Sequence, residues 1–142
     1  MGSRVEIVEH PIEPAAILAD LAGSSDGAVA LFLGIVRDHH EGRTVLRLEY
    51  HAYPEMALQV MRRIAAEAGS RFGASAVALV HRIGSLRVGE TSVAVAVATE
   101  HRAEAFAACR HAMERIKTEV PIWKKEHFEG GESWVAGSRP DR

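Results

Sequence analysis

Apolar and polar residues alternate along several short segments of the chain, a pattern typical of half-buried β-strands. One of these segments, residues 27–37, is longer and mostly apolar, and its Gly34 indicates a bulge or a close approach between two backbones. The polar residues 38–43, "DHHEGR", predict the turn that follows. The predicted strands are residues 4–10, 27–37, 44–53, 74–84 and 90–99, with "SLRVG" connecting the last two.

Two long segments have apolar residues at helical spacing. The first opens at Pro54, whose missing N–H costs nothing in the first turn of a helix. The second opens at His101 and ends before Pro121, because proline biases the preceding Val120 away from helical geometry. A shorter helix, closed by a glycine, is predicted at residues 13–23. The faces expected to be buried are Met56, Val60, Met61, Ile64, Ala68 and Phe72 in the first long helix, and Phe106, Cys109, Met113 and Ile116 in the second.

The C-terminal part predicts a hairpin of residues 122–128 and 132–137 about the turn "EGGE". In total the pattern indicates about six strands and about three helices, with strands that neighbour in sequence. Such an order favours an α+β fold with a mainly antiparallel sheet. A chain of 142 residues suits one core, so we expect a single domain over residues 1–142.

The composition is that of an ordinary globular protein, with 47% hydrophobic and 25% charged residues. A formal net charge of −2 gives no electrostatic reason to expect nucleic acid or an anionic membrane as a partner. The segment "MGSRVEIVEH" lacks the apolar core of a signal peptide, and no apolar run approaches the length of a membrane span. The single cysteine, Cys109, excludes an internal disulfide and fits a reducing compartment, so we expect a cytoplasmic protein.

Positive charge is unevenly divided between the two kinds of cation. All three lysines lie within residues 115–126, "RIKTEVPIWKKE", whereas the other fourteen basic residues are arginines. Arginine stays protonated, but a lysine that is buried or crowded can lose its proton and act as a base or nucleophile. The cluster therefore marks a candidate site, although an arginine-rich composition alone would also produce it.

A second candidate lies where the helix after residue 100 should begin. His101 and Arg102 are cations at the positive end of the helix dipole, which is unfavourable by ~0.3–1 kcal/mol each. Backbone N–H groups, an arginine and a histidine at a helix start can form a pocket for phosphate or carboxylate. The alternative is that Arg102 points into solvent and pairs with Glu100 or Glu104.

Three more basic residues could join such a site. Lys117 lies next to Ile116 at the edge of the apolar helix face, although a cation is also favoured in any last helical turn. Lys124 follows Pro121, so a rigid turn could bring it back beside Lys117. Arg37 ends an apolar strand, a common place for a binding residue and also for a solvated cap. The residues alone thus predict a basic, anion-binding site but no particular reaction.

Other kinds of site have little support. His39 and His40 are adjacent, and neither they nor Cys109 with His111 have a spacing that suits a metal, so no metal or other cofactor is expected. Cys109 is interpreted as a small buried hydrophobe rather than a nucleophile. A non-catalytic module that binds a phosphorylated ligand or an acidic peptide stays open as an alternative to an enzyme. A nucleic-acid-binding module is disfavoured by the net charge.

Three stretches of the chain together resemble the large, catalytic subunit of molybdopterin synthase. They are "GAVALFLGIVRDHHEG", "HRIGSLRVGETSVAVAVATEHRAEAF" and "RIKTEVPIWKKEHFEGGESWV", and "LEYHAYPEMA" fits the same pattern. The combination of "VR", "HRIG", "HR", "KT..PIWKKE" and "WV" in this order is specific, whereas no single motif is. The resemblance covers residues 3–136 and leaves the tail 137–142 unassigned.

The resemblance implies an α/β-hammerhead fold and a homodimer of this chain. Each end of that dimer would bind a small ubiquitin-like partner, giving a heterotetramer, and the partner's C-terminal Gly-Gly tail would carry a thiocarboxylate into a pocket of this subunit. The implied substrate is cyclic pyranopterin monophosphate (precursor Z). Two sulfur transfers would convert it to molybdopterin, which makes the chain a sulfurtransferase of molybdenum cofactor biosynthesis.

The resemblance also implies roles for individual residues. It places the essential lysine at Lys117 and a second catalytic lysine at Lys124, and both would also contact substrate. Lys117 would transfer a proton or form a transient bond to the partner's terminal carbonyl, and these two roles stay open. The other implied substrate-binding residues are Ile35, Val36, Arg37, His101, Arg102, Lys125 and Glu126.

Overall fold

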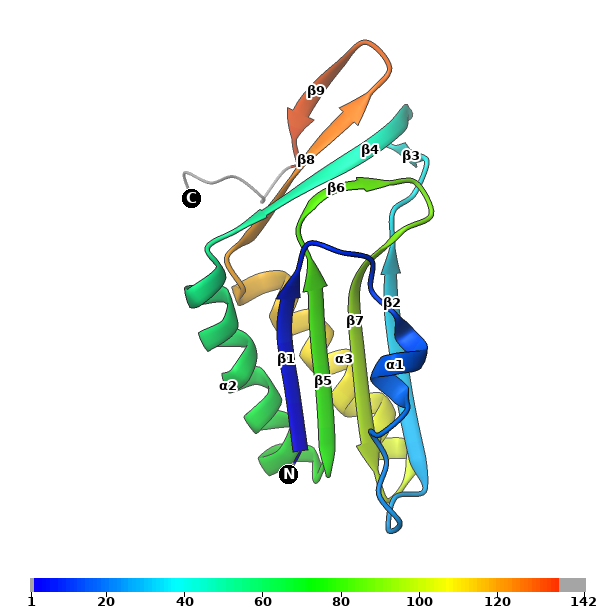
Figure 1. Cartoon of the computed structure of the whole chain (residues 1–142), viewed down its shortest axis with the longest axis vertical. Helices are drawn as coiled ribbons and strands as arrows, with labels where there is room; N and C mark the ends of the chain where they lie inside the picture. The colour runs from blue at the N-terminus through cyan, green and yellow to red at the C-terminus, as the bar shows by residue number, and fades with distance from the viewer. Residues whose placement is uncertain (1, 136–142) are drawn as a thin grey trace.

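A four-stranded sheet with the strand order β1-β5-β7-β2 forms the lower part of the molecule (Figure 1). Its strands are β1 (Gly2–Val8), β2 (Ala28–Ile35), β5 (Ala76–Arg82) and β7 (Thr91–Thr99). β1 pairs with β5 in parallel, whereas β5 with β7 and β7 with β2 are antiparallel. The structure is a computed structural model that describes residues 2–135.

A second sheet of five strands lies above the first and lengthens the molecule (Figure 1). Its central strand, β4 (Arg43–Ala52), pairs with β3 (His39–His40), with β6 (Gly84–Arg87) and with β8 (Ile122–Phe128). The last strand, β9 (Gly131–Trp134), pairs with β8. All these pairs are antiparallel, so the predicted α+β fold with mainly antiparallel sheet is confirmed.

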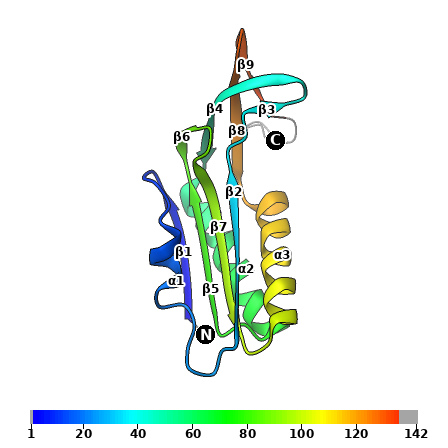
Figure 2. The ribbon, with the colours of Figure 1, turned by 90° about the vertical axis from the view of Figure 1, so that its right-hand side faces the viewer.

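Two long helices cover one face of the first sheet, and a short one lies on the other face (Figure 2). The long helices are α2 (Pro54–Phe72) and α3 (Arg102–Glu119), and the short one is α1 (Pro14–Leu18). α2 ends at Gly73, whose φ of 70° is a left-handed conformation that glycine adopts without steric cost. α3 ends at Val120, which is extended with ψ 129° before a proline, as predicted.

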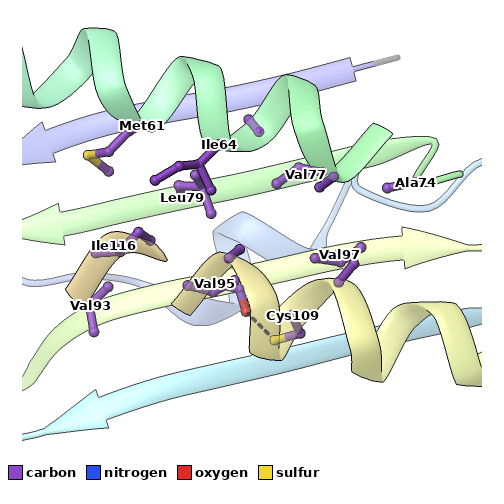
Figure 3. Packing of buried hydrophobic residues seen from close by; sticks show 14 of the residues in the cluster. Met61, Ile64, Ala74, Val77, Leu79, Val93, Val95, Val97, Cys109 and Ile116 are labelled. Atoms are coloured by element: carbon purple, nitrogen blue, oxygen red, sulfur yellow. Dashed lines mark hydrogen bonds between the residues drawn. The ribbon is translucent and has the colours of Figure 1, made fainter. Parts of the chain in front are cut away.

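The main core lies between the two long helices and the first sheet (Figure 3). Met61 and Ile64 of α2 pack with Leu79 and Val95 of the sheet, and all four are at most 1% exposed. Cys109 of α3 is 7% exposed and its thiol lies 3.6 Å from the Val95 carbonyl oxygen, so its prediction as a buried hydrophobe is confirmed. A separate small cluster of apolar side chains holds the second sheet together: Val36, Val45, Leu48 and Leu86.

Some elements differ from the predictions. The described residues contain nine strands instead of about six. Seven of them correspond to the seven ranges predicted above, the segment 85–89 contributes β6, and the polar turn 38–43 contributes β3. β6 forms because Leu86 is fully buried in the small cluster, a long-range contact that local pattern does not reveal. α1 ends at Leu18 instead of near residue 23, where the Asp26 carboxylate accepts the N–H of Gly23 and makes a turn.

Two side chains predicted to be buried are exposed. Met56 in the first turn of α2 is 55% exposed, and Phe106 in α3 is 69% exposed. Helical spacing alone placed them on the buried faces, but Met56 begins its helix and Phe106 borders the edge strand β2, where the sheet gives no further cover. The last residues of the predicted hairpin, 136–137, and the tail 137–142 lie outside the described residues. No helix within residues 2–135 has the length and apolar character needed to cross a membrane.

Candidate active site

Three cations gather where the two sheets meet. Lys117 lies in the last turn of α3, and Lys124 lies in β8, which begins directly after that helix. Arg37 follows β2, whose register against β7 shifts between Gly34 and Ile35. The charges of Lys117 and Arg37 both act on Lys124. The structure therefore brings together the three cations that the sequence placed in one site.

A cavity of about 90 Å³ opens beside these cations, between the end of β2 and strands β3, β4 and β8. Both apolar and charged side chains line it. Four of the residues implied by the resemblance line it. The lining residues are Ile35, Arg37, His39, His40, Val45, Leu48, Tyr50, Lys124, Glu126 and Val135.

Lys124 has the most altered environment of the cations at this cavity. Burial of its side chain lowers its pKa, and the positive charges of Lys117 and Arg37 lower it further, while Glu126 acts in the opposite direction. Lys124 is therefore closer to losing its proton at neutral pH than an ordinary lysine. Lys117, which we expected at the edge of the apolar face, is exposed.

Glu126 is a buried wall residue of the cavity, only 3% exposed. One carboxylate oxygen accepts a hydrogen bond from His40 Nδ1 at 2.8 Å, and the other accepts one from Arg43 Nη2 at 3.3 Å. Its side chain lies on the same face of β8 as that of Lys124, two residues earlier. Glu126 thus supplies a fixed negative charge close to the amine.

Two other implied residues lie away from the cavity. Lys125 is on the opposite face of β8, where its Nζ is 3.1 Å from Glu132 and 5.1 Å from the centre of the Trp134 ring. Val36 is buried, its N–H donates to the Glu90 carbonyl at 3.0 Å, and its own carbonyl accepts from the Gly89 N–H at 2.9 Å. The backbone of Val36 is therefore already used within the protein.

His101 and Arg102 lie at the opposite end of α3 from Lys117 (Figure 1). A helix rises 1.5 Å per residue, so Arg102 is roughly 22 Å from Lys117 along the axis. His101 is exposed, with its Nε2 3.4 Å from a Glu100 carboxylate oxygen. Within one chain, the predicted anion site therefore falls into two separate parts.

Sequence reasoning missed several cavity residues. His39 and His40 were considered only as metal ligands, and within residues 2–135 no group of three or more His, Cys, Asp or Glu side chains is arranged to hold a metal. Tyr50 was treated as one member of an alternating strand. Its place opposite Lys124 in the β4–β8 pairing is a long-range contact, and only its position two residues from the buried Leu48 indicated the inward face.

An apolar groove of about 330 Å³ runs between the edge strand β2 and α3. Phe32 and Phe106 are 41% and 69% exposed there, which is unusual for side chains of this size. Met113 also lines the groove and precedes Lys117 by about one helical turn, so the groove leads toward the cations. The remaining lining residues are Ala30, Leu31, Cys109, Arg110 and Glu114.

Comparisons with known proteins agree with the sequence resemblance. The family model described as MoaE protein matches residues 7–119. A molybdopterin synthase catalytic subunit from Halalkalibacterium halodurans is 43% identical over 134 residues, covering 94% of this chain and 86% of that protein. The crystal structure of molybdopterin synthase from Staphylococcus aureus matches with a TM-score of 0.88 and 38% identity, covering 92% of this chain and 96% of that chain.

A complex of subunits 1 and 2 of molybdopterin-converting factor from Helicobacter pylori contains a chain of the same fold. The TM-score is 0.78, 93% of this chain and 90% of that chain are covered, and the identity is 18%, so this likeness concerns the fold alone. The family match spans most of the chain, and the relative from Halalkalibacterium halodurans is similar over nearly its full length. The chain belongs to the MoaE protein family.

Proposed function

We propose that this chain is the catalytic subunit of a molybdopterin synthase, a sulfurtransferase that converts precursor Z to molybdopterin. The proposal rests on the cluster of Arg37, Lys117 and Lys124 beside a cavity, in a chain of the MoaE family. Sulfur would come from the C-terminal thiocarboxylate of a small ubiquitin-like partner, one atom in each of two transfers. The single cysteine fits a cytoplasmic enzyme, and we propose that residues 1–142 form one domain.

The cations match the charges that this reaction must handle. Precursor Z has a phosphate, to which Arg37 at the cavity can donate charge-assisted hydrogen bonds. When a thioacyl carbon is attacked, negative charge develops on the atom bonded to it, and a fixed ammonium stabilises that charge. A cavity lined by Arg37, Lys124 and a buried carboxylate, with the charge of Lys117 acting on Lys124, can do both.

The two lysines suit different tasks. Lys124 is half-buried with a lowered pKa, so it releases a proton more readily than an ordinary lysine. Lys117 is exposed at the end of the apolar groove, where an incoming tail would first meet the site. We therefore assign proton transfer to Lys124, and contact with the partner's terminal carbonyl to Lys117.

The partner's docking surface in this proposal is the groove between β2 and α3. It is apolar, exposed, and directed toward Lys117. A Gly-Gly tail has no side chains, so it can pass a narrow opening beside the helix end.

A homodimer would reunite the two parts of the anion site. In a two-fold dimer with antiparallel α3 helices, His101 and Arg102 of one protomer come close to Lys117 of the other. Their distance from Lys117 within one chain and their implied role in substrate binding both favour this arrangement.

The experiment is a reconstitution with a thiocarboxylated Gly-Gly partner and precursor Z, with the product followed by mass spectrometry. We expect dithiolene product from the wild type and near-complete loss in Lys117→Arg, which keeps the charge but removes the amine. Lys125→Arg is the matched comparison, because it makes the same change on the opposite face of β8. Absence of product from the wild type with an intact thiocarboxylate and a cognate partner would favour the non-catalytic binding module.

Complementation between protomers tests the dimer. Lys117→Arg and Arg102→Ala chains are each expected to be inactive alone. Mixed one to one, half of the dimers would contain both chains, and one of the two sites in each would be intact, so we expect about a quarter of wild-type activity. If both residues served a site within one chain, no mixed dimer would have an intact site and activity would not return.

A further inference from the structure

A row of buried polar side chains extends from Lys124 into the protein, and the roles assigned above do not use it. Tyr50 of β4 lines the cavity and is the cross-strand partner of Lys124. His81 of β5 is 6% exposed and packs edge-on against the Tyr50 ring, with 5.2 Å between the ring centres. Its Nδ1 donates to the Arg82 carbonyl oxygen at 2.8 Å. The imidazole is thus fixed in one orientation behind the tyrosine.

The row continues from Tyr50 to the end of β2. Tyr50 is hydrogen-bonded to the Ser92 hydroxyl, and Ser92 Oγ donates to the Gly34 carbonyl oxygen at 3.2 Å. Gly34 is the residue at which the register of β2 against β7 shifts, and Arg37 follows three residues later. A Cβ at Gly34 would lie 2.7 Å from Val93 Cγ1, so a larger residue does not fit there without a shift of its neighbours. Tyr50 therefore lies beside the strand of Lys124 and is linked through Ser92 to the bulge before Arg37.

We propose that Tyr50, supported by His81 and Ser92, is a positioning residue that holds Lys124 and the bulge before Arg37 at a fixed separation and keeps water from the inner side of Lys124. The proposal rests on the proposed function only for its kinetic consequences. The positions of Lys124 and of the bulge before Arg37 do not depend on that function.

The row suits this role because it excludes water without adding charge. Burial raises the pKa of Tyr50 and lowers that of His81 to about 4, so both side chains are neutral at pH 7. The charged groups that act on Lys124 are Lys117 in α3, Arg37 after β2, and Glu126 on β8 itself. Burial is the largest contribution to the lowered pKa of Lys124, and Tyr50 lies beside it.

The chain offers a direct measurement, because it contains three lysines whose side-chain NMR signals can be assigned with Lys→Arg variants. In His81→Asn, water can enter behind Tyr50. Because water stabilises the charged form of Lys124, the neutral amine is then less favoured than in the wild type. We expect the titration of Lys124 to move to higher pH by at least about 0.5 unit, while that of Lys125 stays in place. No sulfur transfer is needed for this readout.

The kinetic test uses Tyr50→Phe, which keeps the ring against His81 but removes the hydroxyl that reaches Ser92. We expect single-turnover sulfur transfer to slow about tenfold, with the affinity for precursor Z unchanged, because loss of the link misplaces the cations relative to one another. Ser92→Ala should reproduce this effect. Tyr53→Phe removes the same hydroxyl from a 53% exposed ring and should leave the rate unchanged.

The outcomes separate the two proposals. Wild-type protein without product would overturn the proposed function, and a shifted Lys124 titration in His81→Asn would still support the positioning role. An active wild type with unchanged rates in Tyr50→Phe and Ser92→Ala would overturn the positioning role. If His81→Asn does not fold, the Tyr50 and Ser92 variants decide.

Discussion

The two faces of β8 hold the same kind of residue in opposite environments. Lys124 and Lys125 are consecutive, yet the first lines the cavity and has a lowered pKa, and the second lies over the exposed side beside Glu132 and Trp134. The pleat of a strand alone separates them, because successive side chains point to opposite faces. Neighbouring lysines in one motif therefore have different chemistry, and a motif match by itself does not say which one reacts.

The acidic residues differ in the same way. Glu126 on the cavity face is 3% exposed and bonded to His40 and Arg43. On the outer face, Glu132 has a side chain that is 51% exposed and pairs with Lys125. Charges on the cavity face are thus fixed and shielded from water, whereas those on the outer face are screened.

The largest expected difference is in activity. Lys124→Arg should lower product formation by about 100-fold or more, because arginine keeps the positive charge but cannot exchange a proton. Lys125→Arg should stay within about twofold of wild type, since its amine only pairs on the outer face. Both are measured by single-turnover sulfur transfer. Equal losses of activity in the two variants would contradict the conclusion that only the cavity face of β8 takes part in the reaction.

Stability should differ next. Glu126→Gln leaves the His40 and Arg43 side chains without their buried anion and should cost about 3 kcal/mol of unfolding free energy. Glu132→Gln should cost less than about 0.5 kcal/mol, because the Glu132 side chain is 51% exposed and solvent screens its ion pairs with Lys125 and His127. Urea unfolding at pH 7 compares the two, with the slope of the transition as a check on two-state behaviour. Similar midpoints would show that the buried network does not stabilise the fold.

The two faces of β8 should also differ in how their contributions to stability depend on pH. The pKa of His81, behind the cavity face, is lowered from 6.5 to about 4, so the unfolded chain binds a proton in this range and the native state does not. Stability should therefore fall by about 2 kcal/mol between pH 7 and pH 5. His81→Asn should lack this fall.

On the outer face of β8, the loss of stability on acidification should begin at a lower pH. The hydrogen bond from His127 lowers the pKa of Glu49 below 4.5, so its contribution is present above that pH and disappears as the carboxylate is protonated. Glu49→Gln should flatten the curve only below about pH 4.5. Chemical unfolding at several pH values distinguishes the two variants, and a fall above pH 5 that survives in His81→Asn would point to another group.

The smallest expected effect is the contact between Lys125 and Trp134. The ammonium lies 5.1 Å from the ring centre at a partly exposed position, so a double-mutant cycle of Lys125→Gln and Trp134→Leu should give a coupling of about 0.5 kcal/mol. A coupling above about 2 kcal/mol would mean that the outer face is desolvated, for example by an interface.

The periodic elements could be predicted from the sequence, because spacing of apolar residues is a local property. α2, α3 and the strands β5 and β7 lie where the pattern indicated them. β6 was missed because this four-residue strand depends on pairing with β4, far away in sequence. β3 was missed because its two residues, directly before β4, lie in the polar segment that indicated only a turn. The exposure of Phe106 was missed for a related reason, because the edge of a sheet is defined by topology.

The candidate site was predicted in part. Arg37 and Lys124 meet at one cavity as expected, because β2 and β8 converge where the sheets join. Arg102 and Lys117 are separated because they lie at opposite ends of α3. The sequence indicated the length of this helix, but the prediction of a single pocket was not consistent with that length. Tyr50 and His81 could not be recognised without the pairing of β4 with β8 and the packing of their rings.

Gly34 limits how this chain can be changed. With Val93 Cγ1 at 2.7 Å and Ser92 Oγ at 3.2 Å from the place of a Cβ, even alanine would force its neighbours to shift. In a library covering all substitutions, we expect this position to tolerate fewer replacements than exposed positions of the same strand such as Val29. This one glycine therefore limits which substitutions can change the direction of the Arg37 side chain. A design that aims to reposition Arg37 should begin at Gly34.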